Sequence, residues 1–264
     1  GSIPVTNMVL FATNSFNCEG CLQSGLYMVG FDGANLTRLS LEGIFPAWER
    51  GFDRFAYIRG GELWVANADG SQPTQITHAY ASLSAPAWNS DSITLVADCM
   101  PYGQHDVCLI DTETGLVHNL TPEIVYGTGI PYPYWLGDDE LVLGQTRIDL
   151  EAQITGTLPV IGRVSPDGTR IATIQNRQLH VVDIDGANDV ALTSDPTTKG
   201  FPVWSAGSDL IVYEVAPGDG RLYLYAIRAD GVNGGYLLTP QAISPGPPSR
   251  PNSISDWLGY SFGP

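Results

Sequence analysis

The chain ends in Asp-Trp-Leu-Gly-Tyr-Ser-Phe-Gly-Pro, and residues 259–263 match the Gly-x-Ser-x-Gly spacing of a serine nucleophile elbow. Such an elbow needs a strand before the serine, a helix after it, and an aspartate and a histidine later in the chain. Ser261 is followed by only three residues, and no histidine comes after it. We therefore interpret the match as chance and assign Ser261 no catalytic role.

The four cysteines form two local pairs that could bind a metal, carry out redox chemistry or form disulfides. A zinc site would need both pairs to converge on knuckle-like turns, and a redox site would need Cys-x-x-Cys at the start of a helix. Neither context is visible around Cys18 and Cys21 or around Cys99 and Cys108. We predict two local disulfides, Cys18–Cys21 and Cys99–Cys108, which implies an oxidising compartment.

Other groups capable of metal or acid–base chemistry are scattered. Residues 183–189, Asp-Ile-Asp-Gly-Ala-Asn-Asp, look like a calcium loop, but their glycine is fourth rather than sixth and Ser194 stands at position twelve. We predict a two-residue hairpin turn there, no metal site and no cofactor. The histidines lie in separate segments without metal-binding spacing: His78, His105, His118 and His180.

Composition limits the class of protein and of partner. The 264 residues are 43% hydrophobic and 15% charged, with 30 glycines and 19 prolines, which favours an all-β protein with many tight turns. The net charge of -16 argues against nucleic acid and anionic membrane surfaces as partners. No apolar run is long enough to insert into a membrane. Gly1-Ser2 has the composition of an expression-vector remnant. We expect residues 3–264 to form one domain and the protein to be a monomer.

One phrase recurs about six times: a Pro-aromatic run, a turn, an apolar strand, a second strand ending in Asp-Gly, and a short strand ending in Leu-Thr. Its first part stands at 45–53, 85–92, 132–139, 162–168, 201–209 and 253–259. An aromatic position within it is shared by five tryptophans, with Val164 in the sixth copy: Trp48, Trp88, Trp135, Trp204 and Trp257.

Four short strands repeated six times predict a six-bladed β-propeller of four-stranded antiparallel blades. The first copy begins at its second strand, at residues 8–14, and the last stops after its first, at residues 253–259. We expect these two segments to pair, so that N- and C-terminal strands share one blade and close the ring. The fourth copy lacks the Asp-Gly and Leu-Thr signals over residues 147–160, so we expect its outer strands to be short or irregular.

The segment Val-Ser-Pro-Asp-Gly-Thr-Arg-Ile-Ala-Thr (164–173), followed by Leu-His-Val-Val-Asp-Ile-Asp-Gly (179–186), resembles the TolB-like, WD40-like (PD40) propeller repeat family. The resemblance covers about 250 residues and is specific for the fold rather than the function. It implies a bacterial, extracytoplasmic, non-enzymatic binding protein. The sequence has no counterpart of TolB's helical N-terminal domain, so the resemblance does not imply TolB's own partnership.

The long loops that lead into the first strand of each copy are rich in aromatic residues. Phe45, Tyr132, Phe201 and Arg250 stand just before or at the start of these strands, so we expect them to line the channel mouth as a ligand face. The alternative is that they only cap the core.

Three functions remain open at this point. The first is an extracytoplasmic binding or sensor domain of a larger anchored bacterial protein, which takes a protein or a small ligand at the channel mouth. The second is an accessory domain of, or itself, a metal-dependent hydrolase or lyase. The third is a scaffold whose acidic face binds a basic partner. We favour the first, because the predicted inner strands lack histidine and carry few charges.

Overall fold

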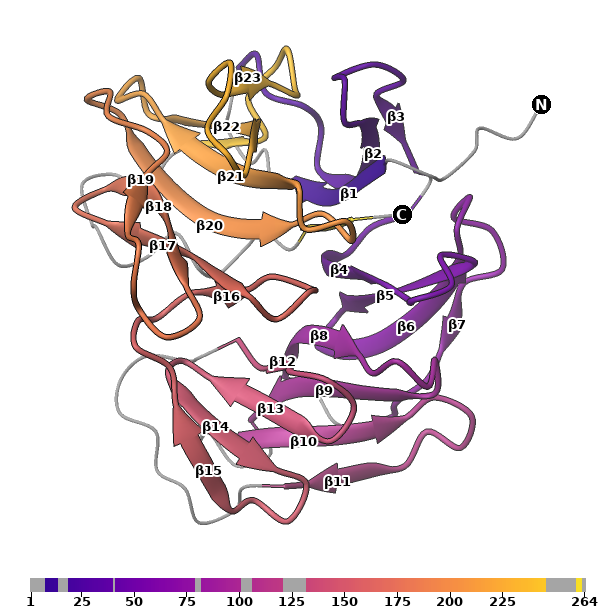
Figure 1. Cartoon of the computed structure of the whole chain (residues 1–264). Coiled ribbons are helices and arrows are strands. Elements are labelled where there is room, and N and C mark those ends of the chain that lie inside the picture. Colours follow the sequence, from indigo (N-terminus) through magenta and orange to yellow (C-terminus); the bar gives the residue numbers. More distant parts are fainter. Residues whose placement is uncertain are drawn as a thin grey trace. The chain divides into compact units, whose positions relative to one another are not determined.

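The computed structural model describes residues 8–13, 19–39, 41–78, 82–100, 106–120, 132–245 and 260–262. Within these ranges the chain forms strands β1 to β25 and no helix. The strands build six antiparallel sheets (Figure 1). In each sheet, four successive strands of the repeat pair in order, the first with the second, the second with the third and the third with the fourth. This is the blade architecture of a propeller. The predicted all-β, six-bladed β-propeller is therefore confirmed.

The chain divides into two compact units. Unit 1 contains residues 41–158 and three blades, one after another along the chain. Its strands are β4 (Ile44–Trp48), β5 (Arg54–Arg59), β6 (Glu62–Asn67) and β7 (Thr74–Gln75); β8 (Leu83–Trp88), β9 (Thr94–Cys99), β10 (Asp106–Asp111) and β11 (Val117–Asn119); and β12 (Tyr134–Trp135), β13 (Glu140–Leu143), β14 (Thr146–Asp149) and β15 (Ile154–Thr157).

Unit 2 contains residues 5–40 and 159–264 and the other three blades. That residues 3–264 form one domain stays a prediction. The strands of unit 2 are β16 (Arg163–Val164), β17 (Arg170–Gln175), β18 (Gln178–Asp183) and β19 (Val190–Ala191); β20 (Thr198–Trp204), β21 (Leu210–Ala216), β22 (Arg221–Arg228) and β23 (Tyr236–Leu237), with β24 (Ser244–Pro245) added; and β25 (Tyr260–Phe262), β1 (Met8–Thr13), β2 (Gly25–Gly30) and β3 (Thr37–Arg38).

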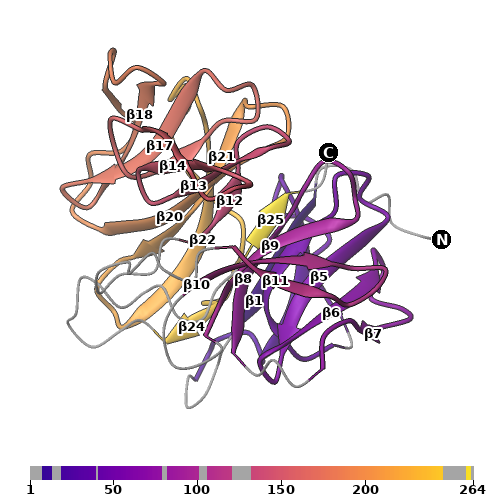
Figure 2. The ribbon, with the colours of Figure 1, turned by 90° about the horizontal axis from the view of Figure 1, so that it is seen from below.

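The two ends of the chain share one blade, as expected, but the closing strand differs from the predicted one. Strand β25 lies beside β1 and pairs Phe262 with Val9 and Tyr260 with Phe11 (Figure 2). The prediction placed residues 253–259 there, with Trp257 in the shared aromatic position, and those residues lie outside the described ranges. Tyr-Ser-Phe alternates like a strand and ends in an aromatic residue, so the repeat pattern cannot distinguish the two registers. Ser261 is in the middle of this strand, where no nucleophile elbow forms.

The fourth copy of the repeat builds a complete but short blade. Strand β15 has no Leu-Thr ending, yet Leu158 N donates to Gln145 O, which closes the blade. The β14–β15 register shifts between Arg147 and Ile148, a bulge that fits the irregularity expected of these outer strands. Strand β24 was not predicted: it pairs with the start of β22.

The repeated tryptophan position is the same in the structure as in the sequence. Trp48, Trp88, Trp135, Val164 and Trp204 each end the first strand of a blade and pair with the second residue of the repeat's second strand. Three of the indoles donate a hydrogen bond to the first strand of the preceding blade. The acceptor is the backbone carbonyl of the residue just before that blade's own tryptophan or valine: Trp88 Nε1 to Ala47 at 3.0 Å, Trp135 Nε1 to Ala87 at 3.0 Å and Trp204 Nε1 to Arg163 at 2.7 Å.

An arginine covers two of these indoles from the preceding blade. The Arg54 guanidinium lies 5.4 Å from the centre of the Trp88 ring, and that of Arg170 lies 5.1 Å from the Trp204 ring. Each arginine also donates to a carbonyl in the turn after the tryptophan, that of Ser92 or Ser208. The cation–π contact and the hydrogen bond together join neighbouring blades within each unit.

The Leu-Thr endings have a structural purpose of their own. The hydroxyl of the threonine accepts a hydrogen bond from a backbone N–H at the start of the third strand: Thr77 from Leu63, Thr193 from Leu179 and Thr239 from Leu224. Thr77 and Thr239 are buried. Because a buried N–H without an acceptor is costly, the threonine stabilises the outer hairpin in these three blades.

Replacing Trp204 with phenylalanine tests the indole bridge. The Trp204→Phe variant loses the donor and leaves the Arg163 carbonyl without it, so we expect the free energy of unfolding to fall by about 1–3 kcal/mol. Urea unfolding followed by circular dichroism measures the change. Trp64→Phe is the control, since Trp64 lies half-buried on the third strand β6 and its indole makes no hydrogen bond to another described residue. An equal loss in both variants would contradict the assignment.

Candidate functional site

Each blade has two ends with different residues. The connection end is where the chain enters the first strand and where the second strand leads into the third. The turn end is the opposite end, where the first strand turns into the second and the third strand turns into the fourth. The predicted ligand face, with Phe45, Tyr132, Phe201 and Arg250, belongs to the connection ends. Each unit contributes three blades, and therefore three connection ends.

In unit 1 the structure brings Phe45 and Tyr132 together. Their ring centroids are 6.0 Å apart, and both rings pack on the hydrophobic cluster between the first two blades of the unit. Phe45 is only 6% exposed, so its side chain belongs to the core. Tyr132 is half-buried and has a part of its surface open. Of these two residues, Tyr132 is the one that a ligand can reach.

Phe201 occupies the matching position in unit 2. It is half-buried and packs against the cluster that joins the β20–β23 blade to the β25–β1–β2–β3 blade. Arg250, the fourth predicted residue, lies outside the described ranges. A direct role of Phe45, Tyr132, Phe201 and Arg250 in ligand binding stays a prediction.

A repeated bulge positions these connection-end residues. The register of the first and second strands shifts at the same place in three blades, and the bulged residue precedes a proline. Phe45, Ala85 and Phe201 there have positive φ angles of 50°, 47° and 43°. Such angles are uncommon for residues other than glycine, and bulges re-aim side chains where they occur. The repeat pattern gives no sign of these angles.

Ile161 is an exposed apolar residue at a connection end that sequence reasoning did not find. It stands between β15 and β16, and 68% of its surface is open to solvent. The aromatic signal that identified the other connections is missing from Leu-Pro-Val-Ile-Gly (158–162). The exposed side chain could have been found only by asking which residues of this loop have no place in a strand.

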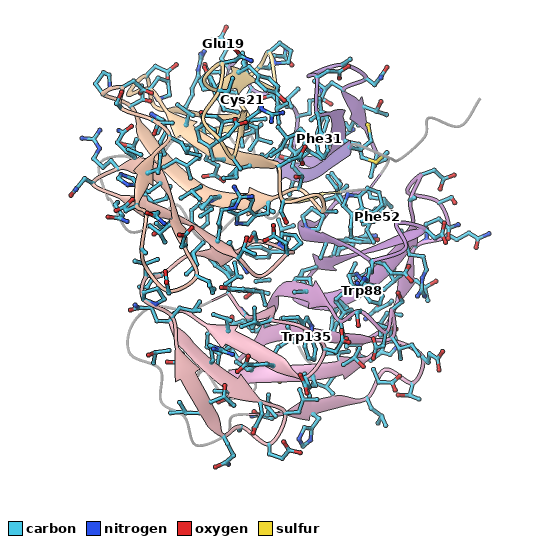
Figure 3. The ribbon with its side chains drawn as sticks, in the orientation of Figure 1. Glu19, Cys21, Phe31, Phe52, Trp88 and Trp135 are labelled. Carbon is cyan, nitrogen blue, oxygen red and sulfur yellow. A yellow bond between two sulfur atoms is a disulfide. The ribbon has the colours of Figure 1, made fainter. Side chains whose placement is uncertain are left out.

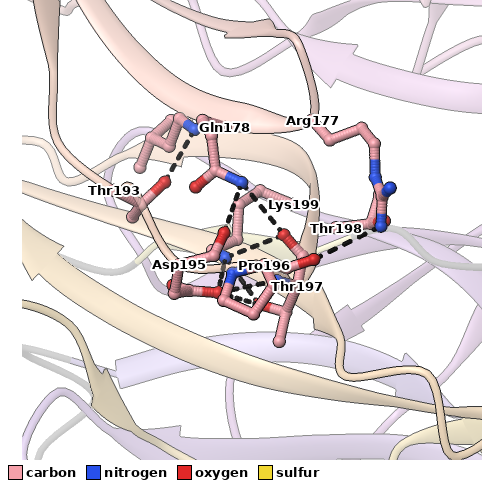
Figure 4. A network of polar contacts seen from close by, with 9 residues as sticks. Arg177, Gln178, Thr193, Asp195, Pro196, Thr197, Thr198 and Lys199 are labelled. Atoms are coloured by element: carbon pink, nitrogen blue, oxygen red, sulfur yellow. Dashed lines mark hydrogen bonds and ion pairs between the residues drawn. The ribbon is translucent and has the colours of Figure 1, made fainter.

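The connection into β20 is held by a buried lysine (Figure 4). Lys199, the only lysine of the chain, has a side chain that is 2% exposed. Its ammonium donates to Asp195 Oδ1 at 2.7 Å, to Thr197 Oγ1 at 2.6 Å and to the Thr197 carbonyl at 3.1 Å. Gln178 donates to the Asp195 and Thr197 carbonyls from the neighbouring blade. These bonds fix the loop that leads to Phe201.

The lysine also determines the acidity of Asp195. Burial raises the pKa of the Asp195 carboxyl, but hydrogen bonds from Lys199 and Thr197 outweigh this effect and hold the pKa at about 2. The carboxylate is therefore ionised at any pH in the physiological range. The whole network connects the second-to-third strand turn of one blade to the first strand of the next.

Glu214 is, after Ile161, the second residue that the sequence did not point to. It lies near the end of β21, opposite Gly200, and is 1% exposed. Neither carboxylate oxygen has a hydrogen-bond partner among the described residues. Burial raises its pKa to about 8. Asp98 stands in the corresponding place of the β8–β11 blade, but there Ser84 donates to the carboxylate at 2.7 Å.

The structure contains the Cys99–Cys108 disulfide, which joins β9 to β10. Cys21 also takes part in a disulfide, and Cys18, its predicted partner, lies outside the described ranges. Cys21 and the core tryptophans Trp88 and Trp135 are labelled in Figure 3. Both oxidised cysteine sites lie near a turn between the second and third strands of a blade.

The segment 183–189 is a turn, but not the two-residue turn that was predicted. Asp183 N donates to Ala187 O and Gly186 N to Asp183 O, so three residues lie between the ends of the hairpin. Asp185 accepts from the Ala187 N–H and Asp189 contacts His180 Nδ1 at 2.7 Å. The side chains that resembled calcium ligands are thus engaged in the turn. Among all described residues, no group of three His, Cys, Asp or Glu could hold a metal ion.

Comparison with solved structures finds the same fold in other proteins. TolB from Acinetobacter baumannii aligns over 97% of this chain and 66% of its own, with a TM-score of 0.74 and 16% identity. A putative TolB from Agrobacterium tumefaciens aligns over 97% and 98%, with a TM-score of 0.64 and 15% identity. The structural neighbours are TolB-like β-propellers. No family model and no curated protein matches the sequence.

A further neighbour is an enzyme, the hydrazine synthase of Kuenenia stuttgartiensis. It aligns over 97% of this chain but only 47% of its own, with a TM-score of 0.65 and 13% identity. At identities of 13–16% these likenesses establish a shared fold and no shared activity. No helix of the described residues is long and apolar enough to cross a membrane.

Removing the Cys99–Cys108 disulfide tests its contribution. In a Cys99→Ala, Cys108→Ala variant, the hairpin is no longer cross-linked in the unfolded chain, so we expect a loss of about 2–4 kcal/mol in the free energy of unfolding. Urea unfolding measures this loss, and the intact mass of the wild type before and after reduction serves as the control. Cysteines 99 and 108 that react with a thiol reagent in the native, unreduced protein would contradict the disulfide.

Replacing Lys199 tests the loop network through its pH dependence. Asp195 has a pKa of about 2 when folded and an ordinary value of 3.8, so its contribution to stability is complete above about pH 4 and is lost as the pH falls to about 2. In Lys199→Met this acid-dependent loss should become smaller, because the main donor to the carboxylate is gone. Urea midpoints between pH 2 and pH 5 measure it. Arg38→Met, at an exposed base, should keep the wild-type slope.

Proposed function

We propose that this chain is a non-enzymatic, extracytoplasmic binding propeller that takes a protein partner at the connection ends of its blades. It would act as the sensor or ligand-binding part of a larger, membrane-anchored bacterial protein. The observation that carries the proposal is the exposed Ile161 at a connection end. Phe201, half-buried at another connection end of the same unit, adds aromatic surface of the kind enriched at protein interfaces. In unit 1, Tyr132 is a half-buried aromatic residue at a connection end.

The carboxylates of the turn ends already have a structural role. They cap the turns that carry them by accepting backbone N–H groups two or more residues ahead: Asp32, Asp69, Asp111, Asp149, Asp167, Asp185 and Asp230. The acidity of these ends therefore has a structural explanation in the turns themselves. This weakens the hypothesis of a scaffold that binds a basic partner through its acidic face.

Two observations support the extracytoplasmic location. The Cys99–Cys108 disulfide is stable only in an oxidising environment in most organisms. The structural neighbours include TolB and a putative TolB, with which the chain shares its fold along nearly all of its length. The sensor role and the membrane anchor are further parts of the proposal.

The test compares two exposed apolar residues of unit 2 at opposite ends of the strands. Ile161 is 68% exposed at a connection end, and Val232 is 53% exposed at a turn end. Immobilised wild-type protein would be used to capture proteins from the cell-envelope fraction of the source organism. We expect Ile161→Asp to reduce capture of the partner about tenfold or more, as for the loss of an interface hot spot. Val232→Asp should leave capture unchanged.

The outcomes separate the proposal from its alternatives. Equal capture by the Ile161→Asp and wild-type proteins would exclude the connection end of that blade, and loss in Val232→Asp alone would transfer the interface to the turn ends. If both variants capture the partner as well as the wild type does, and capture disappears in 0.5 M salt, the acidic scaffold would be favoured. Phe45 is unsuitable for such a test, because its truncation would leave a cavity in the core.

A further inference from the structure

Glu214 lies inside an apolar interface between two blades of unit 2. On β21 it stands between Val212 and Ala216, so the three side chains share one face of the sheet. Val212 belongs to a hydrophobic cluster that also contains Val9 of β1 and Val29 of β2. Leu224, the cross-strand partner of Glu214, is in the same cluster. The carboxyl therefore sits between the β20–β23 blade and the blade that the two chain ends share.

Among the described side chains of this interface, nothing compensates for a negative charge. Glu214 is 1% exposed, and both of its oxygens lack a hydrogen-bond partner among the described residues. Other buried acids of the chain have donors, such as Glu49, which accepts two bonds from Arg54. On the opposite strand, Gly200 brings no side chain: a Cβ there would lie 3.6 Å from Glu214 Oε2. An unpartnered buried carboxyl is tolerated only in its neutral form.

The charged groups of the packed strands lie elsewhere. Strand β1 has no ionisable residue, and β2 brings only Tyr27. On β20, the Lys199 ammonium is bound to Asp195 and Thr197. On β22, Leu222, Leu224 and Ala226 face the cluster, so Arg221, Tyr223 and Tyr225, which alternate with them, face away. Arg228, at the exposed far end of β22, is paired with Asp230. Burial is accordingly the cause that raises the pKa of Glu214 to about 8, and no charged neighbour contributes.

We propose that Glu214 is a proton-dependent latch: only its neutral carboxyl is compatible with packing of the β20–β23 blade on the β25–β1–β2–β3 blade, and loss of the proton loosens this interface. In the opened interface water reaches the carboxyl, whose pKa then returns to its ordinary value of 4.5. Between about pH 4.5 and pH 8, the opened form releases its proton and the closed form keeps it. The opening equilibrium constant therefore rises about tenfold per pH unit in this window and is constant outside it.

Hydrogen exchange measures this opening directly. For wild-type protein between pH 5 and pH 8, after correction for the intrinsic exchange rate, we expect the protection factors of the β1, β21 and β22 amides to fall by up to about tenfold per pH unit. In Glu214→Gln the same amides should show protection that does not change with pH. Glu151→Gln, at an exposed turn of unit 1, makes the same change of charge and should keep the wild-type slope.

Three results would overturn the latch. The first is protection of β1 and β21 in the wild type that does not depend on pH, and the second is an unchanged slope in Glu214→Gln. The third is an equal slope for the β5, β6 and β9 amides of unit 1, which would show global unfolding instead of the opening of one interface. If Glu214→Gln does not fold, the ¹³C shift of the wild-type Glu214 carboxyl against pH decides, since titration near 4.5 excludes a buried neutral group.

Discussion

The hydrogen bond from a tryptophan indole to the first strand of the preceding blade is the contact that relates one blade to the next. A first strand has a sheet neighbour on one side only, so carbonyls along its other edge need donors from elsewhere. Trp88, Trp135 and Trp204 supply such donors at equivalent places. The same large side chain fills the space between two sheets and, through its hydrogen bond, fixes the position of one sheet against the other. Apolar contact alone would fill the space without fixing the position, and strand pairing acts only within one sheet.

The second link between neighbouring blades keeps its geometry while its residues change. Arg54 and Arg170, each at the start of a second strand, donate to a carbonyl in the first turn of the following blade. In the β8–β11 blade that place is occupied by Thr94, which cannot reach so far. There, Asn89 Nδ2 donates to the Asp138 carbonyl at 2.8 Å. The fold therefore requires a donor at this turn rather than a particular residue.

The sequence predicted the features that have a repeated residue pattern and missed the features that have none. Equivalent tryptophans, Asp-Gly turns and Leu-Thr endings recur often enough to give the six blades and the shared terminal blade. The predicted register of the closing strand was wrong: Trp257 and Phe262 both satisfy the pattern, and the strand that pairs with β1 is residues 260–262. The bulge at Phe45 and Phe201 has no sequence signal. The buried carboxyl of Glu214 has none either, because strand periodicity predicts which face a side chain is on and does not predict its hydrogen-bond partners.

The positive charges of the chain are largely committed to its own framework, and this determines how its surface interacts. Arg54 and Arg170 cover neighbouring tryptophans, Arg147 binds Glu140 and Lys199 is buried. Several aspartates, by contrast, face solvent at the turns and accept a backbone N–H there, as Asp69, Asp111 and Asp185 do. These turn aspartates contribute to the net charge of -16, and they hinder contact with anionic surfaces at any part of the protein that shows these turns. Specific binding then depends on surfaces where apolar side chains such as Ile161 interrupt the charge, because there desolvation opposes association least.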